Sequence, residues 1–125
     1  MSKLITDAEF EVMDVLWRQS PLAASDVAAE VAPKTSWTLK TVKTLLSRLV
    51  DKGALTHEAE GRRYLYRPAI SRKAYAKNET RSFAEKLFAG RAAPIVAHLA
   101  DSRGLSEDDI QDLEKLIAEL KRDAH

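Results

Sequence analysis

The chain has 125 residues, a formal net charge of +1 and no cysteine. This length allows one compact domain, or a small domain followed by a segment that is stable only when paired. The absence of cysteine excludes disulfides, thiolate metal sites and cysteine nucleophiles. No apolar run approaches the roughly 20 residues that cross a bilayer, and the first residues lack the features of a signal peptide. We therefore expect a cytoplasmic protein without membrane association.

The small net charge conceals an uneven distribution of charged residues. The segment up to Val31 is mainly acidic. Between residues 34 and 52, in contrast, the only acid is Asp51, and it is accompanied by five basic residues: Lys34, Lys40, Lys43, Arg48 and Lys52. Positive charge gathered in one segment is typical of a surface that binds nucleic acid.

Two helices are predicted in the first part of the chain. Residues 6–9 read threonine, aspartate, alanine and glutamate, which is the form of a capping box, so we expect a helix from Asp7 to Arg18. Apolar residues recur with helical spacing between Ala24 and Val31 and predict a second, short helix that ends before Pro33.

A third helix is predicted from about Thr38, whose hydroxyl can cap it, to Lys52, because Gly53 suits the left-handed conformation that closes a helix. Its two faces differ in chemistry when 100° is counted per residue. The apolar face is expected to join the core: Leu39, Val42, Leu45, Leu46, Leu49 and Val50. The opposite face combines cations with hydroxyls, which suit phosphates and base edges, and supplies the DNA-binding candidates Lys40, Thr41, Lys43, Thr44, Ser47 and Arg48.

A β-hairpin should follow, with strands at residues 54–58 and 63–67 joined through residues 60–62. Its cations Arg62, Arg63 and Arg67 can extend the positive surface to the sugar-phosphate backbone or the minor groove. Three helices followed by a hairpin is the order of a winged helix-turn-helix domain, in which the third helix lies in the major groove. Residues 1–70 are therefore predicted to form a DNA-binding domain.

Residues 71–125 are predicted to form a helical dimerisation domain. Ser71 can cap a long helix that ends near Ala89, Gly90 and Pro94 should interrupt it, and two further helices should follow, the last of them capped by Ser106. The predicted fold class is thus mainly α with a small β-hairpin wing.

The apolar stripes of these last helices are too extensive for so short a segment to cover by itself. Pairing with a second copy would cover them, and the alternative is packing onto the chain's own first domain. Burial of each large side chain is worth roughly 1.5 to 3 kcal/mol as an upper estimate. A two-fold dimer would read an inverted repeat with half-sites about 34 Å apart or at a multiple of that distance. The candidate dimerisation residues are Phe83, Leu87, Ile95, Leu99, Ile110, Leu113, Leu116, Ile117 and Leu120.

Other function classes have less support in the sequence. His57, His98 and His125 show no metal-ligand spacing, and every glycine is explained by a turn or a helix end, so we expect no enzyme, metal or cofactor. Two alternatives stay open: a winged-helix module that binds an acidic protein, and a regulator with a small-molecule effector between its two domains. Preference for one duplex sequence would argue against the first, and a metabolite that weakens operator binding would favour the second.

Residues 37–55, which contain the predicted third helix and the start of the hairpin, resemble the penicillinase-repressor (BlaI/MecI/CopY) family, and residues 9–17 and 63–66 support the resemblance. It extends along nearly the whole chain. The resemblance implies a homodimeric winged-helix repressor that occupies a palindromic operator and blocks transcription. It also implies that Lys43 and Thr44 occupy base-reading positions, with Thr41 and Arg48 alongside.

The resemblance has implications for the release of repression as well. In some members a membrane metalloprotease sensor starts a pathway that ends in cleavage within the dimerisation region, so a regulatory protease is an expected partner. The corresponding position here is His98-Leu99, where the best-known members have asparagine and phenylalanine. Copper-responsive members carry a C-terminal cysteine motif, and the absence of cysteine excludes copper sensing of that kind.

Overall fold

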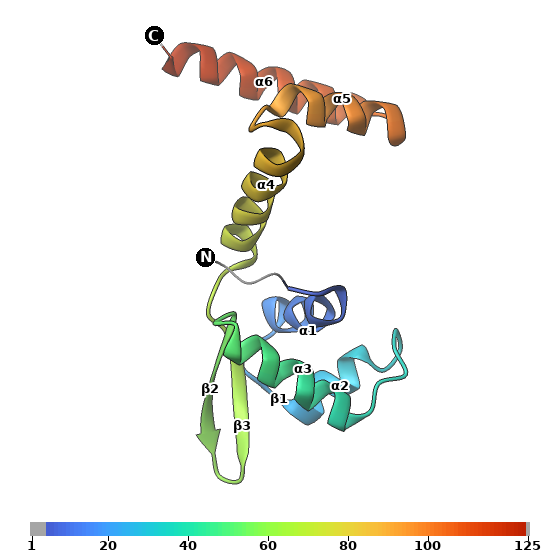
Figure 1. Cartoon of the computed structure of the whole chain (residues 1–125), viewed down its shortest axis with the longest axis vertical. Coiled ribbons are helices and arrows are strands. Elements are labelled where there is room, and N and C mark those ends of the chain that lie inside the picture. Colours follow the sequence, from blue (N-terminus) through green and yellow to red (C-terminus); the bar gives the residue numbers. More distant parts are fainter. Residues whose placement is uncertain (1–4, 125) are drawn as a thin grey trace. The chain divides into compact units, whose positions relative to one another are not determined.

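The computed structural model describes residues 5–124, which form six helices and a three-stranded sheet (Figure 1). The chain divides into two compact units, one that ends at Ala76 and one that begins at Lys77. The predicted fold class, mainly helical with a small β wing, is confirmed, whereas the functional division at residue 70 stays a prediction. In chain order the elements are α1 (Asp7–Arg18), β1 (Leu22–Ala23), α2 (Ala24–Val31), α3 (Leu39–Asp51), β2 (Leu55–Glu60), β3 (Arg63–Pro68), α4 (Arg72–Phe88), α5 (Ala92–Ser102) and α6 (Glu107–Asp123).

The start of α1 is fixed by a capping box, as the sequence predicts. The Glu9 backbone N–H donates to Thr6 Oγ1 at 3.2 Å, and the Thr6 N–H donates to Glu9 Oε1 at 2.8 Å. The same carboxylate forms an ion pair with Lys52 Nζ at 2.5 Å, although the Glu9 side chain is only 1% exposed. Glu9 therefore caps its own helix and also ties it to the residue that follows α3.

The core of the first unit is formed by the apolar sides of α1, α2 and α3 together with the sheet. Helix α3 contributes a continuous stripe, and the fully buried members of that stripe include Val42, Leu46 and Leu49. The assignment of Leu39 to the core is wrong, because this side chain is 42% exposed. Leu39 is the first residue of α3 and precedes the turns that pack against α1 and α2. Leu39 therefore lies on the apolar side of α3, but its side chain remains partly exposed to solvent.

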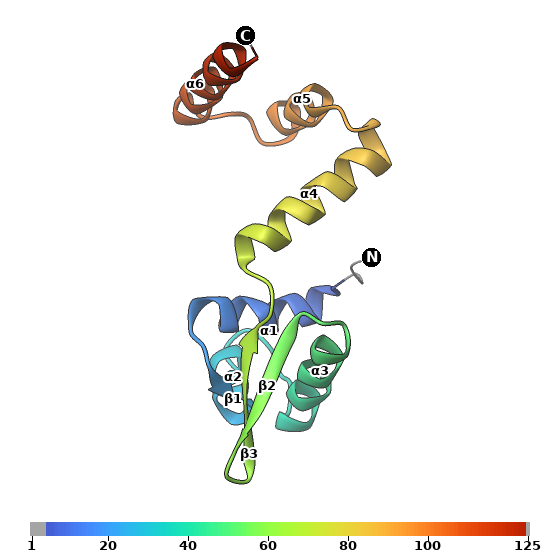
Figure 2. The same ribbon diagram turned by 90° about the vertical axis from the view of Figure 1, so that its left-hand side faces the viewer.

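The sheet has the strand order β1-β3-β2, and both pairs are antiparallel (Figure 2). The hairpin runs two residues further than predicted on its first strand, so that Glu60 faces Arg63 and only Gly61 and Arg62 form the turn. Gly61 has a φ of +64°, which glycine adopts without strain. The sequence did not predict β1. Its two residues are placed by their pairing with Tyr66 and Leu65 rather than by any local pattern.

The second unit has helices but no buried side chain among residues 77–124. Ser106 caps α6 as predicted, with the Asp109 N–H donating to its hydroxyl at 3.0 Å. Pro94 does not interrupt a helix, contrary to the prediction, but lies in the first turn of α5. Proline is tolerated there because the backbone N–H that it lacks would have no intrahelical acceptor. Within the described part of the chain, no helix is both long and apolar enough to cross a membrane.

The Glu9 site generates a prediction for the pH dependence of stability. Burial alone raises the pKa of the Glu9 carboxyl, but the hydrogen bonds from Lys52 and Thr6, together with the charge of Lys52, bring its pKa below the ordinary value of 4.5. A lowered pKa in the folded state means that the ionised carboxylate stabilises the fold above about pH 4.5. This stabilisation is lost as the pH falls through the lowered pKa of Glu9.

We expect Glu9→Gln to decrease the free energy of unfolding by about 1–3 kcal/mol at pH 7, because it removes the buried carboxylate that pairs with the Lys52 ammonium. The difference from wild type should shrink as the pH falls below 4.5. Urea unfolding followed by tryptophan fluorescence measures this, since both tryptophans, Trp17 and Trp37, lie in the first unit. Glu11→Gln on the same helix is the matched control. Parallel loss of stability by wild type and Glu9→Gln in acid would contradict the prediction.

Candidate nucleic-acid interface

The outer face of α3 is directed away from the core because the opposite side of the helix is buried in it. The helix begins at a threonine cap, where the Thr41 N–H donates to Thr38 Oγ1 at 3.2 Å. Its first turn contains no acidic residue. The partial positive charge of the helix N-terminus is therefore not neutralised by a side chain of its own first turn, which favours the approach of an anion.

Five of the six α3 candidates line one open hollow, with a volume of about 580 Å³. Leu39 also lines this hollow. The five candidates comprise three cations and two hydroxyls: Lys40, Lys43, Thr44, Ser47 and Arg48. All five are exposed. Thr41 is the candidate outside this hollow, and its hydroxyl lies 3.2 Å from that of Thr38 at the start of the helix.

The hydroxyl of Thr44 has a defined hydrogen-bonding direction. It donates its proton to the Lys40 carbonyl oxygen, 3.1 Å away, one turn earlier in the same helix. With the donor used inside the helix, Thr44 presents acceptor lone pairs and a methyl group to an incoming molecule. These groups suit the amino groups of adenine or cytosine and the methyl group of thymine.

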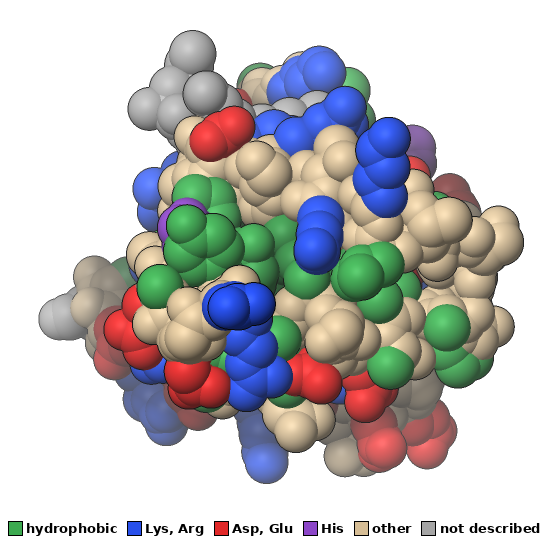
Figure 3. Space-filling model, turned by 90° about the horizontal axis from the view of Figure 1, so that it is seen from below, with side chains coloured by type: hydrophobic (Ala, Val, Ile, Leu, Met, Phe, Trp, Pro, Cys, Tyr) green, Lys and Arg blue, Asp and Glu red, His purple; other side chains and the backbone are tan. Residues whose placement is uncertain are grey.

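A second hollow, of about 200 Å³, lies between α3 and the hairpin. It brings the predicted wing residues Arg62 and Arg63 together with Lys43, and Leu39 and Tyr64 also line it. Lys43 and Leu39 are thus shared by both hollows. Figure 3 shows the hairpin end of the molecule, where Lys and Arg side chains project between hydrophobic ones and most Asp and Glu side chains lie toward one edge.

Several cations of the first unit already have an anionic partner. Arg63 pairs with Glu60 at 2.9 Å, Arg67 pairs with Glu58 at 3.4 Å, and Lys52 is held by Glu9. The hydrogen bond and charge of Glu60 raise the pKa of Arg63. The interface cations that form no ion pair with another described residue are Lys40, Lys43, Arg48 and Arg62. These four carry the uncompensated positive charge of the predicted interface.

Sequence reasoning missed two interface residues, Leu39 and Tyr64. Tyr64 is 51% exposed, and its ring centroid lies 4.4 Å from that of His57 on the neighbouring strand. Tyr66, two residues further, lies 5.7 Å from His57 and is half-buried, and burial raises its pKa. Alternation along β3 places Tyr64 on the same face as the half-buried Tyr66, so no local pattern in the sequence indicates that Tyr64 is exposed, and none indicates that Leu39 is uncovered.

The predicted dimerisation residues all keep apolar surface accessible. Seven of them are exposed, and Ile95 and Leu113 are half-buried. The predicted cleavage pair, His98 and Leu99, lies inside α5, and both side chains are exposed. The His98 ring lies 5.5 Å from that of Phe88. Across residues 5–124, no three histidine, aspartate or glutamate side chains are grouped so that they could hold a metal ion.

Comparison with known proteins connects this arrangement to characterised repressors. The family model described as penicillinase repressor matches residues 5–119. The penicillinase repressor of Bacillus licheniformis is 35% identical over 117 residues, which cover 94% of this chain and 91% of that protein. The methicillin resistance regulatory protein MecI of Mammaliicoccus sciuri is 25% identical over 113 residues, covering 90% and 92% of the two chains.

Two solved structures of the repressor BlaI each match 60% of this chain. The DNA-binding domain of the repressor BlaI is 42% identical with a TM-score of 0.52, and the match covers 60% of this chain and 94% of that one. Monomeric BlaI of Bacillus licheniformis, in complex with the blaP half-operator, is 41% identical with a TM-score of 0.52, covering 60% and 92%. With the family model matching nearly its whole length, this chain belongs to the penicillinase repressor family.

Proposed function

We propose that the protein is a homodimeric, sequence-specific DNA-binding repressor that occupies an inverted-repeat operator. The observation that carries this proposal is the outer face of α3, where three cations and two hydroxyls line one hollow without an acidic side chain. The similar BlaI monomer is a complex with half-operator DNA, which supports duplex DNA as the partner of this surface.

Each side chain of the interface has a role that follows from its chemistry. Lys43, which is shared by both hollows, is placed to donate to guanine, and Thr44 offers its acceptor and methyl group to a neighbouring base. Leu39 supplies an apolar contact for a thymine methyl group. Lys40 and Arg48 hold phosphates, and Arg62 reaches the backbone or the minor groove from the wing.

The proposed dimer is formed by the second unit. Large apolar side chains of α6 recur on one side of the helix and are 44–57% exposed: Ile110, Leu116, Ile117 and Leu120. A helix of this amphipathic pattern gains stability mainly by burying its apolar side against another element. A second copy offers the same surface to it, and a two-fold pair then presents two α3 helices to the two halves of a palindrome.

Release of repression by cleavage between His98 and Leu99 is a further part of the proposal. A protease binds its substrate as an extended strand, so α5 has to open locally before the peptide bond is accessible. Helix α5 has no buried side chain, and elements with few buried contacts open at low free energy. Cleavage there would separate α6 from the DNA-binding unit.

Footprinting of the purified protein on the DNA upstream of its own gene tests the proposed function. The expected result is protection of an inverted repeat that persists in an excess of random duplex. Equal affinity for every duplex, at any ionic strength, would contradict it.

On that operator, Lys43→Ala should weaken binding by about 1–3 kcal/mol and relax the preference at one base pair, because a base contact is lost. Arg48→Ala should weaken binding to all sequences similarly and reduce the salt dependence, as expected for a phosphate contact. Titration of wild type and both variants against the operator and its single-base variants measures these effects. Lys34→Ala, outside both hollows, controls for the loss of charge, and an unchanged base preference in Lys43→Ala would exclude base reading by Lys43.

Truncation of the α6 surface should dissociate the dimer. For Leu116→Ala and Leu120→Ala together we expect the dimer dissociation constant to rise by about tenfold or more per substitution. Sedimentation equilibrium measures this, and affinity for a single half-site should stay unchanged while affinity for the full palindrome falls. Lys115→Ala lies on the opposite side of α6 and is the control. A monomeric wild type that binds the palindrome tightly would contradict the dimer.

Proteolytic release predicts a specific fragment. Intact-mass measurement of the repressor, recovered from cells in which its own promoter has become active, should detect a species that ends at His98. Recovery of full-length protein alone from such cells would show that repression is relieved without this cleavage.

A further inference from the structure

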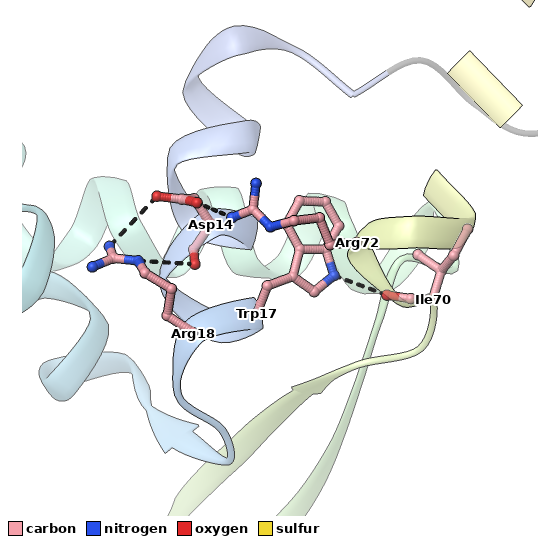
Figure 4. Close-up of polar contacts among 5 residues, drawn as sticks. All are labelled: Asp14, Trp17, Arg18, Ile70 and Arg72. Atoms are coloured by element: carbon pink, nitrogen blue, oxygen red, sulfur yellow. Dashed lines mark hydrogen bonds and ion pairs between the residues drawn. The ribbon is translucent and has the colours of Figure 1, made fainter. Parts of the chain in front are cut away.

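The segment that connects β3 to α4 is held against α1 by a cluster of polar and aromatic contacts (Figure 4). Trp17 Nε1 donates to the Ile70 carbonyl oxygen at 2.9 Å. The Arg72 guanidinium lies over the Trp17 ring, 5.0 Å from its centroid, and forms an ion pair with Asp14. The ring of Tyr75 lies 5.5 Å from that of Trp17. These five residues are called the α4 anchor below.

The α4 anchor is distinct from the surface proposed to bind DNA. None of its five residues lines either hollow of the interface. Trp17 and Ile70 pack against the edge of the core, but no residue of the anchor is fully buried, with Asp14 22% and Arg72 50% exposed. Its contacts join residues more than 50 positions apart in the chain and converge on a single turn of α1. Core packing accounts for the apolar part of Trp17 and Ile70, and the polar contacts of Asp14 and Arg72 add a restraint on the segment that leads into α4.

The α4 anchor acts on the beginning of α4. Arg72 is the first residue of this helix, and Tyr75 follows on its first turn. The other side of α1 packs in the core against α3. Helix α4 then continues without a break to Phe88 and carries Phe83 and Leu87, two of the residues proposed to pair with a second copy. The anchor thus restrains the first turn of α4 against α1, and all of its contacts lie within the first unit.

We propose that the α4 anchor is a specificity device, which restricts the half-site spacing that the dimer accepts. This inference rests on the proposed function, because it concerns a dimer on an inverted repeat. The five residues are positioning residues and do not touch DNA. A dimer whose α4 helices leave the DNA-binding units in a restricted direction fits half-sites at one separation. Without the restraint, the two units adapt to other separations.

The size of the effect is bounded by the strength of the α4 anchor. On a wrongly spaced operator the protein either binds in a strained geometry or breaks the anchor contacts. The anchor therefore cannot contribute more to the discrimination between spacings than the free energy needed to break its contacts. A partly exposed cation–π contact or ion pair corresponds to a factor of about two to five in an equilibrium constant. Loss of Arg72, which makes both contacts, should therefore reduce discrimination by about fivefold, and by no more than about 25-fold per subunit.

The experiment uses the full-length protein and the operator defined by footprinting, together with duplexes in which the half-sites are moved apart or together by one or two base pairs. Each base pair shifts a half-site by about 3.4 Å and rotates it by roughly 35°. The quantity measured is the ratio of the dissociation constant on each altered spacing to that on the native spacing. Arg72→Ala and Trp17→Phe are both measured, since Trp17→Phe keeps a ring but removes the donor to Ile70.

We expect both variants to lower this ratio, while their affinity for an isolated half-site matches that of wild type. Lys73→Ala removes the same charge from the neighbouring position of α4 and should leave the ratio unchanged. Circular dichroism identifies any variant that does not fold, and Asp14→Asn then replaces it. An unchanged ratio in the folded variants, or a wild type that accepts all spacings equally, would overturn the role of the α4 anchor. Failure of the wild type to prefer any duplex over random competitor would instead overturn the proposed function.

Discussion

The structure of the first unit depends on the burial of one side of α3. Val42, Leu46 and Leu49 are withdrawn from water against α1 and α2, and this packing leaves the helix no freedom to rotate about its axis. The side opposite the stripe is consequently held outward, and the backbone positions from which its cations and hydroxyls project are fixed. Recognition by a helix requires this rigidity, because a base edge is read only by groups that are already in place. The hydrophobic stripe thus positions side chains that it never contacts.

Some basic residues of the first unit join distant segments of the chain, and others lie on its surface, unpaired within the described part of the chain. Lys52 and Arg72 form ion pairs that join distant segments, to Glu9 and Asp14 respectively. Lys40, Lys43 and Arg48 form no ion pair with a described residue and lie around one hollow. The first group stabilises the fold, and the second is available to phosphates and bases. A count of cations along residues 34–52 would assign Lys52 to the same surface as Lys40, Lys43 and Arg48. The ion pair of Lys52 with Glu9 shows why that count overestimates the charge of the surface.

Local signals in the sequence were sufficient for most of the fold. The capping box of α1, the cap Ser106 of α6, the glycine after α3 and the apolar spacing predicted where most of the helices lie, because each signal depends on neighbours within a few residues. β1 could not be predicted, since two residues show no periodicity and their conformation depends on pairing with β3. Pro94 was misjudged because a proline in the first turn of a helix and a proline between helices look alike in sequence.

The same distinction applies to the interface. The polar face of α3 followed from helical geometry, and five of its six predicted residues do lie around one hollow. The contribution of Leu39 depends on where the neighbouring helices end, which no local pattern records. The partners of Arg63 and Arg67 likewise depend on the register of the hairpin, which the predicted strands placed differently at Glu60. Contacts between neighbouring elements thus decided which side chains of the predicted surface are free of other partners among the described residues.

The absence of buried side chains from residues 77–124 has a consequence for the amount of active protein in the cell. In the proposed assembly, this half of the chain buries its large apolar side chains only on association, so much of its stability is acquired there. Newly made subunits that have not met a second copy are then the form most open to degradation by housekeeping proteases. Assembly depends on the square of the subunit concentration, and loss of unpaired subunits steepens that dependence. A moderate fall in synthesis would therefore empty the operator more abruptly than simple dilution predicts.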